Sequence, residues 1–328
     1  MNYQKELTFA IEAVRKAGKL CREVQHKLVS ADSMEKKDRS PVTIADLGSQ
    51  AIVTLSLQRD FPGEMLVGEE DSTPLRENAE LKERVHLLLA QFIDPINDAT
   101  LYEAIDFGNQ DPNGTARFWT LDPIDGTKGF LRGEQYAVAL ALIEQGQVVL
   151  GVLGCPNLPL SYQHLEKGEG CLLYAVRGEG CWMEPLDGGE RIPVKVDGFT
   201  NPAEARFCES IEKEHASHEV HEQISRVMGI HRPPFRIDSQ CKYAAVARGD
   251  ASIYFRLPRS SSYREKIWDH AAGVVVLEEA GGKVTDFRGF PLDFSCGKKL
   301  ENNIGLVATN GALHDLTLKA ISEVVHLT

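Results

Sequence analysis

The sequence predicts an α/β protein in two parts, an α+β N-terminal part followed by an α/β C-terminal part. Its 328 residues suit two domains. Between residues 136 and 182, runs rich in Val, Leu and Ala follow one another with only short turns between them, which is typical of antiparallel strands. After Pro202, strand-like runs alternate with helical patterns, which indicates an α/β arrangement. We therefore place a domain boundary near Gly198, between domains of residues 1–198 and 199–328.

The N-terminal part should begin with two helices. Over residues 7–28, apolar residues recur every three or four positions between charges, the pattern of an amphipathic surface helix. Residues 30–40 are rich in charge and poor in apolar side chains, so we expect a loop there. A second helix is predicted over residues 44–60, and it should stop at Pro62 and Gly63.

A short apolar strand over residues 65–67, a helix over residues 79–92 and a polar segment over residues 106–116 come next. Residues 117–121 form a further predicted strand. The later strands expected in this part are Tyr136–Glu144, Val148–Leu153, Gly170–Val176 and Gly180–Trp182. In the C-terminal part, the expected strands are Ala205–Cys208, Ala251–Arg256 and Asn303–Ala308, and the expected helices are His215–Met228, Lys242–Arg248 and His270–Ala280.

The composition narrows the class of protein. Hydrophobic residues make up 42% and charged residues 26%, which is enough material for a core. The seven cysteines contain no C-x-x-C pair and are odd in number, which argues against a secreted disulfide framework and favours the cytoplasm. The N-terminus does not resemble a signal peptide, and no window approaches the roughly 20 apolar residues of a membrane span. We expect a cytoplasmic protein with no membrane partner, and we favour a monomer.

Residues 121–127 (LDPIDGT) place two carboxylates and a hydroxyl around a forced turn after a strand. Pro123 fixes φ, and Gly126 permits a backbone geometry that a Cβ would obstruct, so Asp122 and Asp125 should stay close together. Hard divalent cations prefer such oxygen ligands, and Mg²⁺ takes one or two protein carboxylates together with phosphate oxygens of its substrate. Free backbone N–H groups after the glycine would suit a phosphate. An Asx-turn between two strands is the alternative interpretation.

Other carboxylates strengthen the metal interpretation. Glu69 and Glu70 follow an apolar strand, Asp46 lies near the start of a predicted helix, and Asp269 precedes a run of small residues. Taken singly, these acids could be a solvated turn, a first-turn acid favoured by the helix dipole and an N-cap. Taken together with the two acids of the motif, they favour a metal site.

The net charge of −12 means that the average field repels polyanions, so a nucleic acid polymer is not an expected partner. A phosphate would have to be bound locally, by metals or by a small basic cluster. Six basic residues stand against two acidic ones between residues 242 and 266. A solvated basic face explains Arg248 and Lys266 equally well, whereas we favour a pocket for Lys242 and Arg256. Two further arginines compete with Arg256 for this role: Arg259 and Arg264.

Three motifs occur in a fixed order: Gly68-Glu69-Glu70, Asp122-Pro123-Ile124-Asp125-Gly126-Thr127 and Trp268-Asp269-His270-Ala271-Ala272-Gly273. In this order they resemble the lithium-sensitive, magnesium-dependent phosphomonoesterases typified by inositol monophosphatase. Residues 40–43, 122–136, 238–243 and 263–270 resemble in particular the members of that family that act on bisphosphorylated nucleotides. The resemblance runs from about residue 5 to about residue 310.

The resemblance implies a layered αβαβα sandwich of the inositol monophosphatase and fructose-1,6-bisphosphatase type, with two or three Mg²⁺ ions as cofactors. It implies that Asp46 and Thr127 handle an attacking water, the Asp46 carboxylate accepting a hydrogen bond from the Thr127 hydroxyl. The C-terminal domain would supply nucleotide-binding residues and the last metal ligand. The implied metal ligands are Glu69, Asp122, Asp125, Asp269 and the backbone carbonyl of Ile124. The implied substrate-binding residues are Gly126, Thr127, His215, Ser239, Lys242, Arg256 and Asp269.

The activity implied by the resemblance is hydrolysis of the 3′-phosphate of adenosine 3′,5′-bisphosphate to AMP and phosphate. Use of the sulfated analogue 3′-phosphoadenosine 5′-phosphosulfate stays open, because sulfate and phosphate present similar oxygens. An inositol polyphosphate 1-phosphatase is an alternative that the same metal core would serve. A non-catalytic sensor of adenosine bisphosphate is a second alternative, disfavoured by Asp46 and Thr127, which binding alone would not require. A P-loop hydrolase is not expected, because no G-x-x-x-x-G-K-[ST] string occurs.

Overall fold

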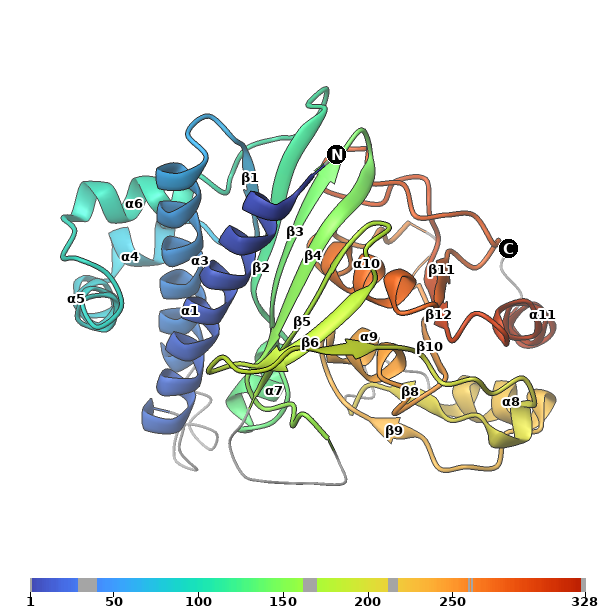
Figure 1. Cartoon of the computed structure of the whole chain (residues 1–328). Coiled ribbons are helices and arrows are strands. Elements are labelled where there is room, and N and C mark those ends of the chain that lie inside the picture. Colours follow the sequence, from blue (N-terminus) through green and yellow to red (C-terminus); the bar gives the residue numbers. More distant parts are fainter. Residues whose placement is uncertain are drawn as a thin grey trace.

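Two β-sheets and three layers of helices organise the chain, as the computed structural model in Figure 1 shows. The structure describes residues 2–28, 40–161, 170–211, 218–258, 260 and 262–325. The layers run from helices α1 and α3, through the first sheet, to helices α9 and α10, then the second sheet, and finally helices α8 and α11. This αβαβα order confirms the predicted fold class.

The first layer contains the two long N-terminal helices, α1 (Gln4–Leu28) and α3 (Ser40–Asp60). Helix α3 begins four residues earlier than predicted, because Pro41 stands in its first turn, where a missing backbone N–H breaks no helical hydrogen bond. As a result, Asp46 lies in the second turn of α3 and is not a first-turn acid. The loop expected over residues 30–40 lies almost entirely outside the described residues.

Three shorter helices extend this layer: α4 (Thr73–Glu77), α5 (Ala79–Leu89) and α6 (Asp98–Asp106). The predicted helix over residues 79–92 is confirmed with an earlier end, whereas α4 and α6 were not predicted. Helix α6 carries a recognisable start signal, since the Asn97 side chain accepts a hydrogen bond from the Thr100 N–H at 2.9 Å. With nine residues it is too short to give a clear apolar period.

The first sheet has seven strands in the order of the sequence. Strands β1 and β2 are parallel, and every later neighbour in the sheet is antiparallel. All the strands predicted for this part are confirmed, with shifts at their ends, and β7 was not predicted. The seven strands are β1 (Leu66–Gly68), β2 (Arg117–Asp125), β3 (Ala137–Glu144), β4 (Gln147–Cys155), β5 (Cys171–Val176), β6 (Cys181–Pro185) and β7 (Ile192–Val194).

Strand β2 extends to Asp125, so Pro123 lies within the strand and the forced turn expected in residues 121–127 begins after it. The register with β3 shifts between Asp122 and Asp125, which leaves the two residues between them outside the ladder. Proline is tolerated at such a bulge, because no ladder hydrogen bond is required of it. The chain turns only at Gly126, which has φ +94°, and the short helix α7 (Thr127–Leu131) follows.

The second sheet is mixed, with the strand order β11-β12-β10-β8-β9. Its strands are β8 (Phe207–Glu209), β9 (Phe235–Arg236), β10 (Ile253–Arg256), β11 (Lys283–Thr285) and β12 (Leu306–Thr309). The helices of this half are α8 (His218–Met228), α9 (Cys241–Ala247), α10 (Ala271–Glu279) and α11 (His314–Val324), preceded by the 3-10 helix η1 (Pro202–Glu204). The strands and helices predicted here are confirmed, and α11 was not predicted.

Helix α10 lies between the two sheets and joins their cores. It packs against β3, β4 and β5 of the first sheet and against β11 of the second. A Cβ added at Gly151 on β4 would lie 2.9 Å from the Ala272 backbone, so the helix and the sheet are in close contact. The apolar core is therefore continuous across Gly198, and the domain boundary there stays a prediction.

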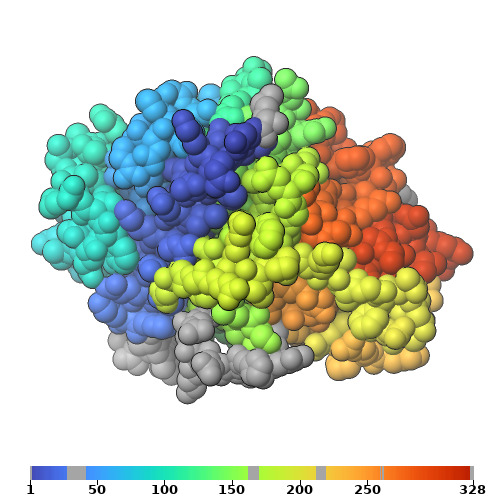
Figure 2. Space-filling view, in the orientation of Figure 1, coloured from blue at the N-terminus to red at the C-terminus, as the bar shows by residue number. Residues whose placement is uncertain are grey.

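In the space-filling view, the blue N-terminal helices and the orange to red C-terminal elements lie on opposite sides, with green and yellow-green residues between them (Figure 2). No helix in the described ranges is long and apolar enough to cross a membrane.

Candidate active site

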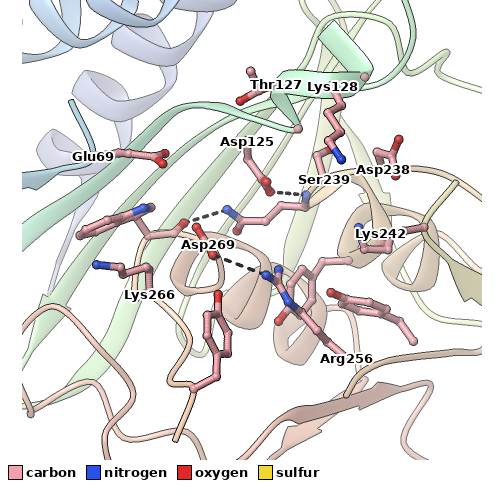
Figure 3. Close-up of a pocket in the computed structure, with 18 of the residues that line it drawn as sticks. Glu69, Asp125, Thr127, Lys128, Asp238, Ser239, Lys242, Arg256, Lys266 and Asp269 are labelled. Atoms are coloured by element: carbon pink, nitrogen blue, oxygen red, sulfur yellow. Dashed lines mark hydrogen bonds and ion pairs between the residues drawn. The ribbon is translucent and has the colours of Figure 1, made fainter. Parts of the chain in front are cut away.

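Elements from both halves of the chain meet around a pocket of about 780 Å³. Its wall includes the residue after β1, the end of β2, the start of α7, the start of α9, the end of β10 and Asp269, two residues before α10. Figure 3 shows Glu69, Asp125 and Asp269 pointing towards one common space from three of these elements. The wall contains eight of the predicted site residues: Glu69, Asp125, Gly126, Thr127, Ser239, Lys242, Arg256 and Asp269.

Asp122 lies on β2 directly before its bulge, near enough to Glu69, Asp125 and Asp269 to be affected by their charges. Its side chain is only 2% exposed, and its Oδ1 atom is buried without a hydrogen-bond partner among the described residues. Burial, followed by the nearby charges of Glu69 and Asp125, raises the pKa of Asp122 well above its usual range. A buried carboxylate oxygen of this kind is costly unless something positive binds it.

The other acids of the cluster repel one another in the same way. Glu69 is open to the pocket, yet the loss of hydration and then the charge of Asp269 raise its pKa to about 8. Burial and then Asp269 also raise the pKa of Asp125, to about 6, although its Oδ2 accepts a hydrogen bond from the Gln240 N–H at 2.5 Å. Burial likewise raises the pKa of Asp269. Four carboxylates thus lie close enough to oppose each other's ionisation.

Asp46 is also affected by the charges of neighbouring acids. It projects from α3, is 8% exposed, and its pKa is raised by burial and then by Glu70 and Glu69. Thr127 is exposed at the start of α7. Its expected pairing with Asp46 stays a prediction.

The donor set fits a hard divalent cation. The acids offer oxygen ligands only, which Mg²⁺ prefers, and the orphaned Asp122 oxygen is an acceptor that a cation would satisfy. Ile124 lies in the bulge of β2, so its backbone is not paired with β3. A metal bound here would lower the pKa values of the acids by replacing their mutual repulsion with attraction.

Two basic side chains, Lys242 and Arg256, line the pocket together with the acids, and we call these two residues the positive wall. Lys242 is buried on α9 at 6% exposed, with its Nζ 5.3 Å from the centre of the Tyr254 ring. Burial lowers the pKa of Lys242, and the charge of Asp125 opposes that effect. Arg256 stands at the end of β10, with its Nε 3.1 Å from Glu265 Oε1.

Ser239 and Gly126, which both line the pocket, are in tight contact. Ser239 has φ +65°, an uncommon conformation for a residue with a side chain, and its Oγ accepts a hydrogen bond from the Cys241 N–H at 3.1 Å. A Cβ at Gly126 would lie 2.9 Å from the Ser239 Cβ. Gly126 is therefore required both by its positive φ and by this neighbour.

Among the arginines considered from the sequence, Arg256 reaches the pocket, whereas Arg264 does not line it. The Arg264 guanidinium donates to the Glu301 carbonyl and to the Tyr263 carbonyl, both at 3.0 Å. Arg248 is held by Asp250 at 2.8 Å and by the Pro159 carbonyl at 2.6 Å, which makes it a structural residue. His215 and Arg259 lie outside the described residues.

The sequence prediction missed several residues that line the pocket, including Lys128, Asp238 and Lys266. Gln240 links the acids to α10, because its Nε2 donates to the Trp268 carbonyl at 2.8 Å and its Oε1 accepts from the Gly273 N–H at 2.9 Å. His221 and Lys298 also line the pocket. Gln240 lies within a segment used for the resemblance, but no local signal distinguishes His221 and Lys298.

Comparison with known proteins gives the class to which this fold and site belong. The model of the inositol monophosphatase family matches residues 2–326, and the chain belongs to that family. Members of the family are generally magnesium-dependent. A solved inositol monophosphatase from Anabaena (Nostoc) sp. PCC 7120 has a TM-score of 0.63 and 22% identity, over 100% of this chain and 99% of that one, which confirms the fold.

Curated relatives are more similar in sequence. A 3′(2′),5′-bisphosphate nucleotidase of Schizosaccharomyces pombe is 42% identical over 99% of this chain and 97% of its own length. An Arabidopsis thaliana protein named 3′(2′),5′-bisphosphate nucleotidase 1 is 46% identical over 98% of this chain and 97% of its own length. The chain is thus similar to these nucleotidases over nearly its whole length.

Proposed function

We propose that this protein is a Mg²⁺-dependent phosphomonoesterase that hydrolyses the 3′-phosphate of adenosine 3′,5′-bisphosphate to AMP and phosphate. The observation that carries the proposal is the buried Asp122 carboxylate, whose orphaned oxygen lies in a cluster of mutually repelling acids opposite a positive wall. The names of the relatives with 42% and 46% identity support the choice of substrate.

In this proposal two or three Mg²⁺ ions bind the acid cluster. Their ligands would be Glu69, Asp122, Asp125, Asp269 and the backbone carbonyl of Ile124. When bound, Mg²⁺ supplies Lewis acidity that neutralises phosphate charge and makes water a better nucleophile at neutral pH. Phosphoryl transfer needs little covalent chemistry from the protein, so positioning and charge should provide most of the acceleration.

Asp46 and Thr127 would then orient the attacking water and hold its proton. Asp46 suits a general base. Burial and the charges of Glu70 and Glu69 raise its pKa, which favours transfer of a proton from the water to its carboxylate. Thr127, exposed to the pocket at the start of α7, offers a hydroxyl that can accept a hydrogen bond from water.

The positive wall would bind the rest of the nucleotide. Lys242 and Arg256 would neutralise the second phosphate, and Ser239 would donate its hydroxyl to it. His215 would contribute from the segment after β8. In this assignment residues 1–198 supply four of the metal ligands with the water-handling pair, and residues 199–328 supply Asp269 and the nucleotide contacts.

Phosphate release from purified protein tests the proposal. Adenosine 3′,5′-bisphosphate, its 5′-phosphosulfate analogue and inositol 1,4-bisphosphate should be compared side by side, with and without magnesium. We expect magnesium-dependent release, fastest from adenosine 3′,5′-bisphosphate. Faster release from inositol 1,4-bisphosphate would reject the nucleotide assignment, and no release from any of the three would reject the enzyme.

A further inference from the structure

Two buried side chains, Glu265 and His270, lie in contact with each other next to Arg256. Glu265 is 4% exposed and His270 is fully buried. The two oxygens of the Glu265 carboxylate lie near different partners. Oε1 forms an ion pair with Arg256 Nε at 3.1 Å without the alignment of a hydrogen bond, and Oε2 lies 3.3 Å from His270 Nε2. Glu265 does not line the pocket itself, but it contacts the pocket residue Arg256, and its charge raises the pKa of Asp269.

The structure holds Glu265 rigidly in place. Its backbone carbonyl accepts a hydrogen bond from the Leu300 N–H at 2.9 Å. His270 is fixed on its far side, because its Nδ1 lies 2.9 Å from the Tyr243 hydroxyl. Tyr243 in turn packs against Gly273 so closely that a Cβ there would lie 2.3 Å from the ring. A carboxylate held in this way can orient the flexible arginine side chain that it contacts.

Arg256 also stands near a second carboxylate. Its Nη2 lies 3.9 Å from Asp269 Oδ2, a contact drawn as a dashed line in Figure 3. Asp269 is a proposed metal ligand, so an arginine that moved closer to it would compete with the metal. Glu265 offers the shorter contact, and it does so with a side chain that is more deeply buried than that of Asp269, 4% against 20% exposed.

We propose that Glu265 is a positioning residue that determines which anion the Arg256 guanidinium binds. It holds the guanidinium by Nε, which leaves the Nη groups to bind the second phosphate of the substrate and keeps Arg256 away from Asp269. This inference rests on the proposed function, because it takes the substrate to be a bisphosphate whose second phosphate meets Arg256.

Substitution Glu265→Gln tests the inference, because it keeps the shape of the side chain and removes its charge. We expect KM for adenosine 3′,5′-bisphosphate to rise about 10- to 100-fold, the range that misplacement of a binding group gives, with a much smaller change in kcat. Adenosine 3′-monophosphate, which lacks the second phosphate, should change by less than about threefold. The double variant Glu265→Gln/Arg256→Met should have the same KM as Arg256→Met alone, because the two substitutions remove the same interaction.

Asp286→Asn is the matched control. Asp286 is a fully buried acid that pairs with Arg288 at 2.8 Å outside the pocket, so its loss should affect stability and leave substrate preference unchanged. Equal losses of Glu265→Gln on both substrates, or additive effects in the double variant, would overturn the positioning role. If Glu265→Gln fails to fold, Glu265→Asp gives the same test, since it keeps the charge but shortens the reach to Arg256.

Binding of AMP separates this inference from the proposed function. AMP keeps the second phosphate and needs no turnover, so calorimetry should show about 10- to 100-fold weaker binding to Glu265→Gln than to wild type. If the wild type releases no phosphate but shows this difference, the proposed reaction fails and the role of Glu265 stands. If turnover occurs and AMP binds both proteins equally, the reaction stands and the role of Glu265 is rejected.

Discussion

Strand β2 carries a cluster of carboxylates at each end, and the two clusters differ in what neutralises them. At its start, Arg117 serves three glutamates: its Nε donates to Glu64 at 2.8 Å, its Nη2 donates to Glu6 at 2.9 Å, and its Nη1 bonds to Glu144. At its end, no basic residue in the described ranges forms an ion pair with Asp122, and Arg256 Nη2 lies 3.9 Å from Asp269 Oδ2. We call the start of β2, where Arg117 neutralises the acids, the closed end, and the end of β2, where the acids around Asp122 repel one another, the open end.

The pKa directions show the same difference. Burial alone would lower the pKa of Arg117, but its bonds to Glu64 and the other glutamates raise it overall, so the paired state is favourable. The pKa of Asp122 is raised because its charge is buried among like charges. The glutamates around Arg117 are neutralised by the protein itself and stabilise the fold. The acids around Asp122 repel one another, and a bound cation would stabilise them.

The largest expected effect is that of Asp122→Asn at the open end. Activity should fall by roughly a thousandfold or more, because a bound metal supplies several kcal/mol of charge stabilisation. The metal-free variant should unfold at the same temperature as wild type or a higher one, because one repelling charge is gone. Steady-state kinetics and thermal unfolding in a chelator measure the two effects. A metal-free variant that melts well below wild type would mean that Asp122 is a structural residue.

Thr127→Ala should have the next largest effect. It should lower kcat by about 10²- to 10⁴-fold, because the water loses one of its orienting groups, while KM and the magnesium requirement stay near those of wild type. Kinetics over a range of magnesium concentrations measure this split. A rise in the magnesium requirement equal to that of Asp122→Asn would place Thr127 among the metal ligands instead.

At the closed end, Arg117→Met should destabilise the protein by about 3 kcal/mol, because three partly buried glutamates lose their shared cation. Activity per folded molecule should not change. Denaturant unfolding measures the loss, and Glu23→Gln on α1, which breaks the exposed pair with Lys27, is the control with an expected change below about 1 kcal/mol. A fall in the activity of folded Arg117→Met would show that the two ends of β2 are coupled.

The smallest expected effect appears only in acid. His314 is fully buried between the Thr285 and Thr309 hydroxyls, and burial, then Lys283, lowers its pKa to about 4. Because the native state then binds fewer protons than the unfolded state, stability falls as the pH drops from about 6.5 to about 4, by up to about 3 kcal/mol.

His314→Gln should flatten that part of the stability curve, as denaturant unfolding at several pH values would measure. An unchanged slope would mean that other groups cause the acid sensitivity. The acid clusters on β2 need no titration of His314, so magnesium-dependent activity at neutral pH should be retained in this variant.

The sequence predicts the site well where its parts are local. Asp122, Asp125 and Gly126 lie within five residues, and proline, glycine and oxygen ligands have physical properties that can be recognised without a structure. Even here the turn comes later than its proline suggests, because β2 continues past Pro123 as a bulged strand. The antiparallel strand pattern was predictable, because from β2 onwards each strand pairs with the next strand along the chain, whereas β1 pairs with β2 across three intervening helices.

Contacts between distant segments could not be predicted. The pairing of Glu265 with Arg256 and the bond from Gln240 to Asp125 depend on how α9, α10 and β10 pack together. In the sequence, Glu265 looks like an ordinary surface acid between two basic neighbours. The early start of α3 is a smaller case, since one proline can either precede a helix or stand in its first turn.

Thermal unfolding with added magnesium tests the open-site account most directly, if sodium chloride is used to match the ionic strength. The account predicts that millimolar Mg²⁺ raises the melting temperature of wild type and of Arg117→Met by the same amount and leaves that of Asp122→Asn unchanged. An equal rise in all three proteins, or no rise in wild type, would contradict it.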